Sequence, residues 1–199
     1  TGGITIGATV DFTSSADIKL GTAADTLTLD ILTESNATVD AGEKTGVIDT
    51  LKYAGANNQG LTVVDLSSTT DQVTQINGAI NSGAQKSFES VDLSGFTGSF
   101  GANITGNAEA NTIVGTINAD TIVAGEAGDT VTGGKGADTI SLTETTAKQD
   151  FIRLEDTVAN NGNDSITGLG TTDMITLDKS DYALNGTVTT DSANTAIDA

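Results

Sequence analysis

The most regular pattern of apolar and polar positions lies between residues 111 and 140, where an Asx-Thr-apolar triplet returns every nine residues. The four triplets are Asn111-Thr112-Ile113, Asp120-Thr121-Ile122, Asp129-Thr130-Val131 and Asp138-Thr139-Ile140. A nine-residue unit is half a coil, with about six residues of turn and about three of strand. Two units return the chain to the same side. The apolar residues should therefore point inward as two facing stacks, and stacking makes their core continuous.

Glycines mark the turns of this array. The last unit, Gly133 to Ser141, fits G-G-x-G-x-D-x-U-x at every specified position, where U is a large apolar residue. That pattern is typical of calcium-binding parallel β-helix repeats. The units that begin at Gly106, Gly115 and Ala124 are degenerate in their glycines but keep the Asx and the apolar residue. Glycine allows a turn to adopt positive φ and to bring its carbonyl groups inward.

Weaker copies of the unit lie outside the array. Asp25-Thr26-Leu27 and Asp49-Thr50-Leu51 precede it. Asp164-Ser165-Ile166 and Asp173-Met174-Ile175 follow it, again nine residues apart. We therefore expect the same unit from near the start of the chain to about residue 178, interrupted by longer loops.

These patterns predict an all-β fold, a parallel β-roll or β-solenoid of nine-residue half-coils over residues 91–178. Val91, Leu93 and Phe96 are spaced as in strands that lead into the array. Residues 1–90 are expected to form an irregular β-rich region with degenerate repeats, and residues 179–199 a polar C-terminal tail. The helical spacing of Val73, Ile76 and Ile80 allows one short helix in the first region.

The composition narrows the classes of partner. The chain has 27 acidic and 8 basic residues, a formal charge of −19, and its few basic residues are scattered. Nucleic acid and anionic membrane surfaces are therefore not expected as partners, because both need a basic patch. There is no Cys and no His, which excludes disulfides and thiolate or imidazole metal sites. No apolar run reaches the roughly 18 residues of a spanning helix, so membrane insertion is not expected.

The parity of the half-coils predicts where the acids meet. Turns on one side come from alternate units, so Asp120 should lie above Asp138 and Asn111 above Asp129. Stacked carboxylates repel each other unless a cation lies between them. Calcium suits such a site because it takes six to eight oxygen ligands, many of which can be backbone carbonyls. The alternative is that these side chains only cap their own turns, as in Asx turns.

The array resembles the RTX, or haemolysin-type calcium-binding, repeats of secreted bacterial proteins, most of all those of RTX-containing S-layer and other bacterial surface proteins. The resemblance implies calcium between successive turns, held by Asp carboxylates and turn carbonyls. The ligands carried over to this chain are Asp120, Asp129, Asp138, Asn111, Gly134 and Gly136, and the weaker copies add Asp164, Asp173, Asp25 and Asp49. The resemblance also implies type I secretion with an uncleaved C-terminal signal.

Three functions remain open on the sequence. The first is a secreted structural protein that self-assembles into an extracellular filament, sheath or S-layer, with calcium driving folding and assembly. The second is a C-terminal secretion and folding module of a larger secreted enzyme, toxin or adhesin. The third, a polysaccharide-active enzyme, is disfavoured because no titratable cluster stands outside the repeats. The first residues, TGGITIGATV, show no signal peptide, so we expect a processed chain, a fragment or export by another route. We expect an extracellular or cell-surface location.

Overall fold

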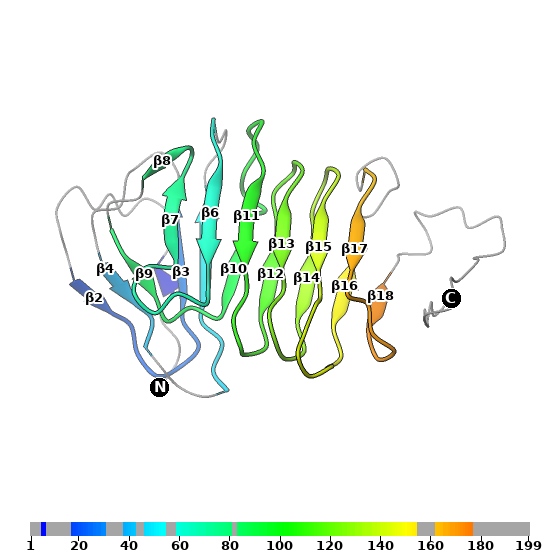
Figure 1. Ribbon diagram of the computed structural model, residues 1–199. Helices are drawn as coiled ribbons and strands as arrows, with labels where there is room; N and C mark the ends of the chain where they lie inside the picture. The colour runs from blue at the N-terminus through cyan, green and yellow to red at the C-terminus, as the bar shows by residue number, and fades with distance from the viewer. Residues whose placement is uncertain are drawn as a thin grey trace.

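The computed structural model describes residues 5–6, 17–30, 38–42, 46–54, 59–80, 83–154 and 162–176. Every regular element in this part of the chain is a β-strand, which confirms the predicted all-β solenoid. Figure 1 shows the strands following one another as a row of flattened coils. The described residues contain no helix long and apolar enough to cross a membrane. The predicted tail, residues 179–199, lies outside the described residues.

Two sheets form the opposite walls of the solenoid. The parallel eight-stranded sheet consists of β1 (Thr5–Ile6), β3 (Thr26–Asp30), β5 (Thr50–Ala54), β10 (Ser90–Asp92), β12 (Thr112–Val114), β14 (Thr130–Thr132), β16 (Phe151–Arg153) and β18 (Met174–Thr176), in that order. The seven-stranded sheet has the order β17 (Ser165–Thr167), β15 (Thr139–Ser141), β13 (Thr121–Val123), β11 (Ala102–Thr105), β6 (Thr62–Asp65), β7 (Val73–Ile76) and β8 (Ala79–Ile80). From β11 onward, successive strands alternate between the two sheets.

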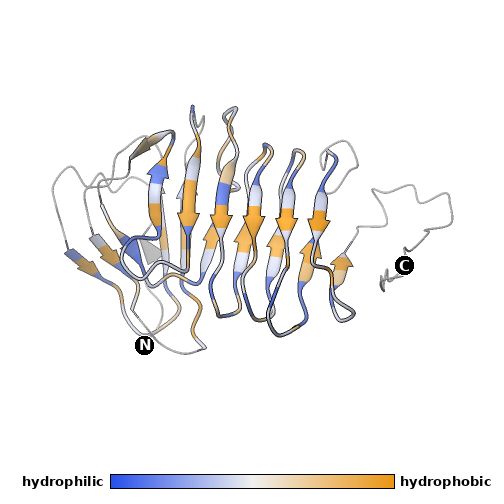
Figure 2. Ribbon diagram, viewed as in Figure 1, coloured by the Kyte–Doolittle hydropathy of each residue, from blue (hydrophilic) through white to orange (hydrophobic). Residues whose placement is uncertain are grey.

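The predicted half-coils are present in the array. Strands of three residues are separated by turns at residues 115–120, 124–129 and 133–138. Ile113 pairs with Val131 in one sheet and Ile122 with Ile140 in the other, so the two predicted apolar stacks are confirmed. All four side chains are fully buried. Figure 2 shows this pattern as apolar strand centres between more polar turns.

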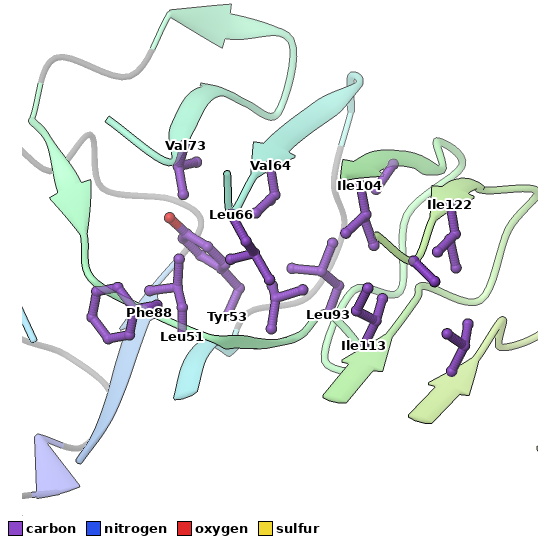
Figure 3. Packing of buried hydrophobic residues seen from close by; sticks show 14 of the residues in the cluster. Leu51, Tyr53, Val64, Leu66, Val73, Phe88, Leu93, Ile104, Ile113 and Ile122 are labelled. Carbon is purple, nitrogen blue, oxygen red and sulfur yellow. The ribbon is translucent and has the colours of Figure 1, made fainter. Parts of the chain in front are cut away.

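The first coils are longer than those of the array. β3 and β5 stack directly on each other, with Leu27 paired to Leu51. The chain between them passes through a third sheet, in which β2 (Asp17–Lys19), β4 (Thr38–Asp40) and β9 (Gln85–Lys86) pair in parallel. The wider interior holds the larger side chains, and Figure 3 shows Tyr53 and Phe88 packed among aliphatic residues from both walls. The third sheet therefore widens the interior of these coils, and larger side chains fill the added space.

The short helix expected near residue 80 is wrong. Residues 73–76 and 79–80 form β7 and β8, an antiparallel hairpin in which Ile76 pairs with Ala79. The turn residues Asn77 and Gly78 have φ of 55° and 80°. Asn-Gly favours such a two-residue hairpin turn because both central residues must adopt positive φ. The turn chemistry therefore overrides the helical spacing of the apolar residues.

The sheets run across the predicted domain boundary at residue 90. β5 and β10 pair in register over three residues, although they lie on opposite sides of that boundary in sequence. The ion pair between Lys52 and Asp92 joins the same two strands. The division into residues 1–90, 91–178 and 179–199 stays a prediction.

Candidate metal-binding turns

An acidic or amide side chain lies directly before most strands of the two long sheets. Along the eight-stranded sheet these form the first column, which consists of Asp25, Asp49, Glu89, Asn111, Asp129, Asp150 and Asp173. Along the seven-stranded sheet they form the second column, Asp120, Asp138 and Asp164. All of them except Asp164 are 8% exposed or less. The predicted stacking of Asn111 with Asp129, and of Asp120 with Asp138, is confirmed.

Hydrogen bonds join the members of a column to each other. In every neighbouring pair except Glu89–Asn111, a side-chain oxygen accepts a hydrogen bond from the backbone N–H of the column residue in the preceding coil. In the first column the donor–acceptor distances are 2.6 Å for Asp25–Asp49, 2.7 Å for Asp49–Glu89, 2.8 Å for Asn111–Asp129, 2.7 Å for Asp129–Asp150 and 3.0 Å for Asp150–Asp173. In the second column they are 2.9 Å for both Asp120–Asp138 and Asp138–Asp164. Each of these side chains therefore supplies the hydrogen-bond acceptor for a backbone N–H group of the preceding coil.

Asn111 has a different bond to the coil before it. Its amide donates to the backbone carbonyl of Glu89 at 2.6 Å and to Oδ1 of Asn107 at 2.9 Å. Only an amide can donate in this way, since an ionised carboxylate is an acceptor alone. The missing charge at this position therefore coincides with a bond that an aspartate could not make.

The second side-chain oxygen of several column residues is capped by the backbone of its own turn. The Thr116 N–H donates to Oδ2 of Asp120 at 2.6 Å, and the Gly170 N–H donates to Oδ2 of Asp173 at 2.6 Å. The Gly21 N–H does the same for Asp25 at 2.9 Å. At Asn111, whose only side-chain acceptor is Oδ1, the Asn107 N–H bonds that atom at 2.7 Å. These are the bonds that the turn-capping alternative predicts.

Asp129 and Asp150 differ from these capped residues. Both side chains are fully buried, and Oδ2 of each accepts no hydrogen bond among the described residues. Neither forms an ion pair in that part of the chain, whereas Lys52 and Lys86 pair with acids outside the columns. A buried, unpaired carboxylate oxygen costs free energy unless a cation or a proton reaches it. These two open carboxylates are therefore the positions most suited to a cation.

The glycines of the turns explain part of this difference. At the second position of the unit, Gly125 and Gly134 have φ of 111° and 99°, as predicted for the glycines of the motif. A Cβ on Gly134 would lie 1.9 Å from the Thr116 carbonyl oxygen, so a side chain cannot fit there. Where the second position is Thr116, its N–H caps Asp120. Where it is Gly125 in the left-handed region, Oδ2 of Asp129 is left open.

In the third and fourth units the fourth position also has positive φ, with 71° at Ala127 and 114° at Gly136. Ala127 shows that the third unit keeps this turn conformation without a glycine at that position. Alanine is strained in this region because its Cβ approaches the backbone. The imperfect third unit therefore folds like the perfect fourth one, at a cost in stability.

We expect Ala127→Gly to stabilise the chain by about 0.5–1 kcal/mol, because it removes the strain of positive φ. The matched control is Ala108→Gly, in an exposed turn residue outside the set with positive φ, which should destabilise by a similar amount. Urea unfolding in the presence of calcium measures both. A loss of stability in Ala127→Gly would show that the strain at this position is negligible.

Burial without a counter-charge raises the pKa of several column acids. It raises the pKa of Asp120 to about 6, although hydrogen bonds from Thr116 and Ala102 act in the opposite direction. It raises the pKa of Asp129 to about 7, and the charges of Asp150 and Glu144 add to the rise. Burial also raises the pKa of Asp150 to about 6. The folded chain therefore favours neutralising these carboxylates, by a proton or by a cation.

The residues present fit calcium. The columns offer oxygen atoms only, and the chain contains no Cys or His that would favour a softer metal. Backbone oxygens also approach the turns, since a Cβ on Gly128 would lie 2.7 Å from the Gln149 carbonyl oxygen. No three acidic side chains converge on one point in the described part of the chain, so a bound ion needs carbonyl ligands as well. Calcium accepts such a mixed set.

Asp150 and Glu89 are column residues that the sequence analysis missed. Asp150 directly precedes β16 and Glu89 directly precedes β10, each with a buried apolar residue two positions on. The signal for Asp150 was Asp150-Phe151-Ile152, but its turn at residues 142–150 breaks the nine-residue step. Glu89 was missed because the repeat pattern has an Asp or Asn at this position, and the glutamate side chain is one methylene longer than that of aspartate. The predicted Asp25, Asp49, Asp164 and Asp173 do lie in the columns, and their metal ligation stays a prediction.

Comparison with known families agrees with these turns. The model of the RTX calcium-binding nonapeptide repeat, in four copies, matches residues 105–140 and 158–180. A search of the curated proteins found no match. The matched ranges include the glycine turns with positive φ and all three members of the second column. RTX nonapeptide repeats bind calcium ions, so calcium is the ion of these turns. The chain therefore contains RTX calcium-binding nonapeptide repeats of the haemolysin type in these two ranges.

Proposed function

We propose that this chain is a secreted structural subunit that folds on binding calcium and self-assembles into an extracellular filament, sheath or S-layer. The observation that carries the proposal is the pair of buried acidic columns, in which Asp129 and Asp150 have no basic partner in the described part. Stacked carboxylates repel each other, and this repulsion destabilises the coils that bring them together. An ion that neutralises them converts its binding free energy into folding free energy.

Within this proposal the calcium ligands come from turns of successive coils. Asp129 and Asp150 would supply their open oxygens, and the turn carbonyls would supply the rest of the coordination. In the second column, Asp138, whose Oδ1 accepts the N–H of Asp120, would also be a ligand. When bound, calcium supplies the positive charge that these turns lack.

The self-assembly part of the proposal rests on the ends of the sheets. In the described part of the chain, β17 and β18 are the last strands of their sheets, and each pairs on one side only. An unpaired strand edge presents backbone donors and acceptors that another chain can pair with. A second copy of the same solenoid offers matching strands in the same parallel arrangement.

A structural role rather than an enzymatic one is also part of the proposal. Every buried acidic side chain in the described residues belongs to one of the two columns. The columns use these acids for hydrogen bonds to backbone N–H groups. A pair of acids set apart for acid–base chemistry would need a cleft of its own.

The test is a calcium titration of the purified chain, followed by far-UV circular dichroism and light scattering together. We expect a transition from disorder to β structure by millimolar calcium, accompanied by growth into large particles. Magnesium at the same concentration is the control, because it demands smaller, octahedral sites and should leave the chain largely unfolded. Folding to a stable monomer would contradict self-assembly and favour a secretion module of a larger protein. No response to calcium would overturn calcium-driven folding itself.

A further inference from the structure

The turn at residues 142–150 is longer than the six-residue turns of the array and carries an acid that no repeat position accounts for. Glu144 lies within this turn, and its Oε2 accepts a hydrogen bond from the Lys148 N–H at 2.7 Å. Its Oε1 is buried and accepts no hydrogen bond in the described part. One oxygen of Glu144 is thus held by its own turn, and the other is open.

The turn at residues 142–150 is hydrogen-bonded to the turn of an earlier coil, residues 124–129. The Thr145 N–H donates to Oε1 of Glu126 at 3.0 Å, and its hydroxyl donates to Oε2 of Glu126 at 3.0 Å. Glu126 belongs to the turn that ends at Asp129. These bonds fix residues 142–150 against residues 124–129, so Glu144 belongs to a turn that is held against the turn ending at Asp129.

The three acids are close enough to act on each other. The charges of Asp150 and Glu144 both raise the pKa of Asp129, and that of Glu144 raises the pKa of Asp150. Each acid has one oxygen bonded to a backbone N–H and one buried oxygen without a partner. None of the three forms an ion pair among the described residues. Three negatively charged carboxylates, each with one open oxygen, therefore lie in one region without a positive charge to balance them.

We propose that Glu144 is a ligand of a calcium ion held between the turns 124–129 and 142–150, together with the open carboxylates of Asp129 and Asp150. The inference rests on the calcium-dependent folding proposed above, and it adds a ligand from outside the repeat pattern. The carbonyl oxygen of Gln149, which approaches Gly128, lies in the same region. The three carboxylates do not converge on one point in this structure, so binding draws the Glu144 side chain inward.

This arrangement distinguishes the site from the capped turns of the same column. In the turns that end at Asn111 and Asp173, the side-chain oxygen is bonded to the N–H of Asn107 or Gly170. A cation there must compete with a backbone donor. At Asp129 and Asp150 it replaces no hydrogen bond, and a third negative charge strengthens the site because calcium affinity rises with ligand charge.

The experiment compares Glu144→Gln with Glu109→Gln in the full chain, using calorimetric titration with calcium. Both variants remove one negative charge from a turn before a strand of the eight-stranded sheet, and Glu109 is exposed. We expect Glu144→Gln to lose one bound ion or to weaken one site about tenfold. Glu109→Gln should bind like the unchanged chain. Equal binding by the unchanged chain and Glu144→Gln would overturn the role of Glu144.

A second measurement needs no variant and therefore does not depend on how a variant folds. Carboxyl groups of the unchanged chain are labelled with a carbodiimide with and without calcium, and the labelled residues are identified by mass spectrometry. We expect calcium to protect Glu144 and to leave Glu109 reactive. Labelling of Glu144 in saturating calcium would overturn this inference, whereas failure of the unchanged chain to bind calcium would overturn the proposed function.

Discussion

Without calcium, a larger fraction of the chain should be folded at about pH 5 than at about pH 8. The reason is that burial raises the pKa of column acids, to about 7 for Asp129 and about 6 for Asp150, from the ordinary value of 3.8. Between the ordinary pKa and the raised ones, the folded chain holds more protons than the unfolded chain. The stability that protonation of these two carboxyls contributes is therefore fully present below about pH 4, and it is lost as the pH rises through about 6 to 7. Far-UV circular dichroism in EDTA, recorded as the pH is varied, measures this dependence.

Calcium should counteract this dependence on pH. Protons and calcium compete for the same carboxylates, so the gain in stability on adding calcium should be larger at about pH 8 than at about pH 5. Asp129→Asn is the informative variant, because its amide oxygen can still accept the Asn111 N–H while its charge is gone. In EDTA it should show a flatter pH dependence than the unchanged chain. A calcium-free chain that becomes more stable with rising pH would contradict the assignment of buried, unpaired acids.

Ile122→Ala should cost about 3 kcal/mol of stability, within the range of about 2–5 kcal/mol for such a truncation. Ile122 is fully buried and pairs with Ile104 on one side and Ile140 on the other, so its removal leaves a gap in a continuous stack. That cost is a large part of the roughly 5–15 kcal/mol of a typical domain. Urea unfolding in saturating calcium gives the difference in free energy.

The control for this variant is Thr121→Ala in the same strand. The Thr121 side chain is exposed and stacks on Thr139 in the neighbouring coil. Its removal should cost about 0.5 kcal/mol or less, since no cavity forms. Similar costs for the two variants would show that the apolar stack does not dominate the stability of the coils.

The nine-residue step predicted the coils of the array because each position of the unit keeps the same kind of residue, such as the Asx or the apolar residue. An apolar residue at every ninth place can be buried only if alternate units stack, which is the observed pairing of Ile113 with Val131. The same reasoning placed Asp120 beside Asp138. Local chemistry of this kind is visible in the sequence, since a strand of three residues has little freedom in its register.

The parts that failed depend on contacts distant in sequence or on turn length. The third wall was not predicted, because β4 and β9 pair across many residues without a shared motif. Asp150 was missed because its turn shifts the register of the repeat. The difference between the capped Asp120 and the open Asp129 could not be read either, because it depends on the φ of one turn residue. The carboxylate environment therefore follows from backbone conformation and not from the motif alone.

The hydrogen bonds from backbone N–H groups to side chains within the columns all point the same way along the chain. In every such bond the backbone N–H belongs to the earlier coil and the side-chain acceptor to the later one, as for Asn111 with Asp129 and Asp129 with Asp150. A coil that forms on the N-terminal side of an existing coil therefore finds its acceptor already in place. A coil that forms on the C-terminal side must bring the acceptor with it. The later coils are thus templates for the earlier ones, and we expect the solenoid to zip from its C-terminal coils toward its N-terminal ones.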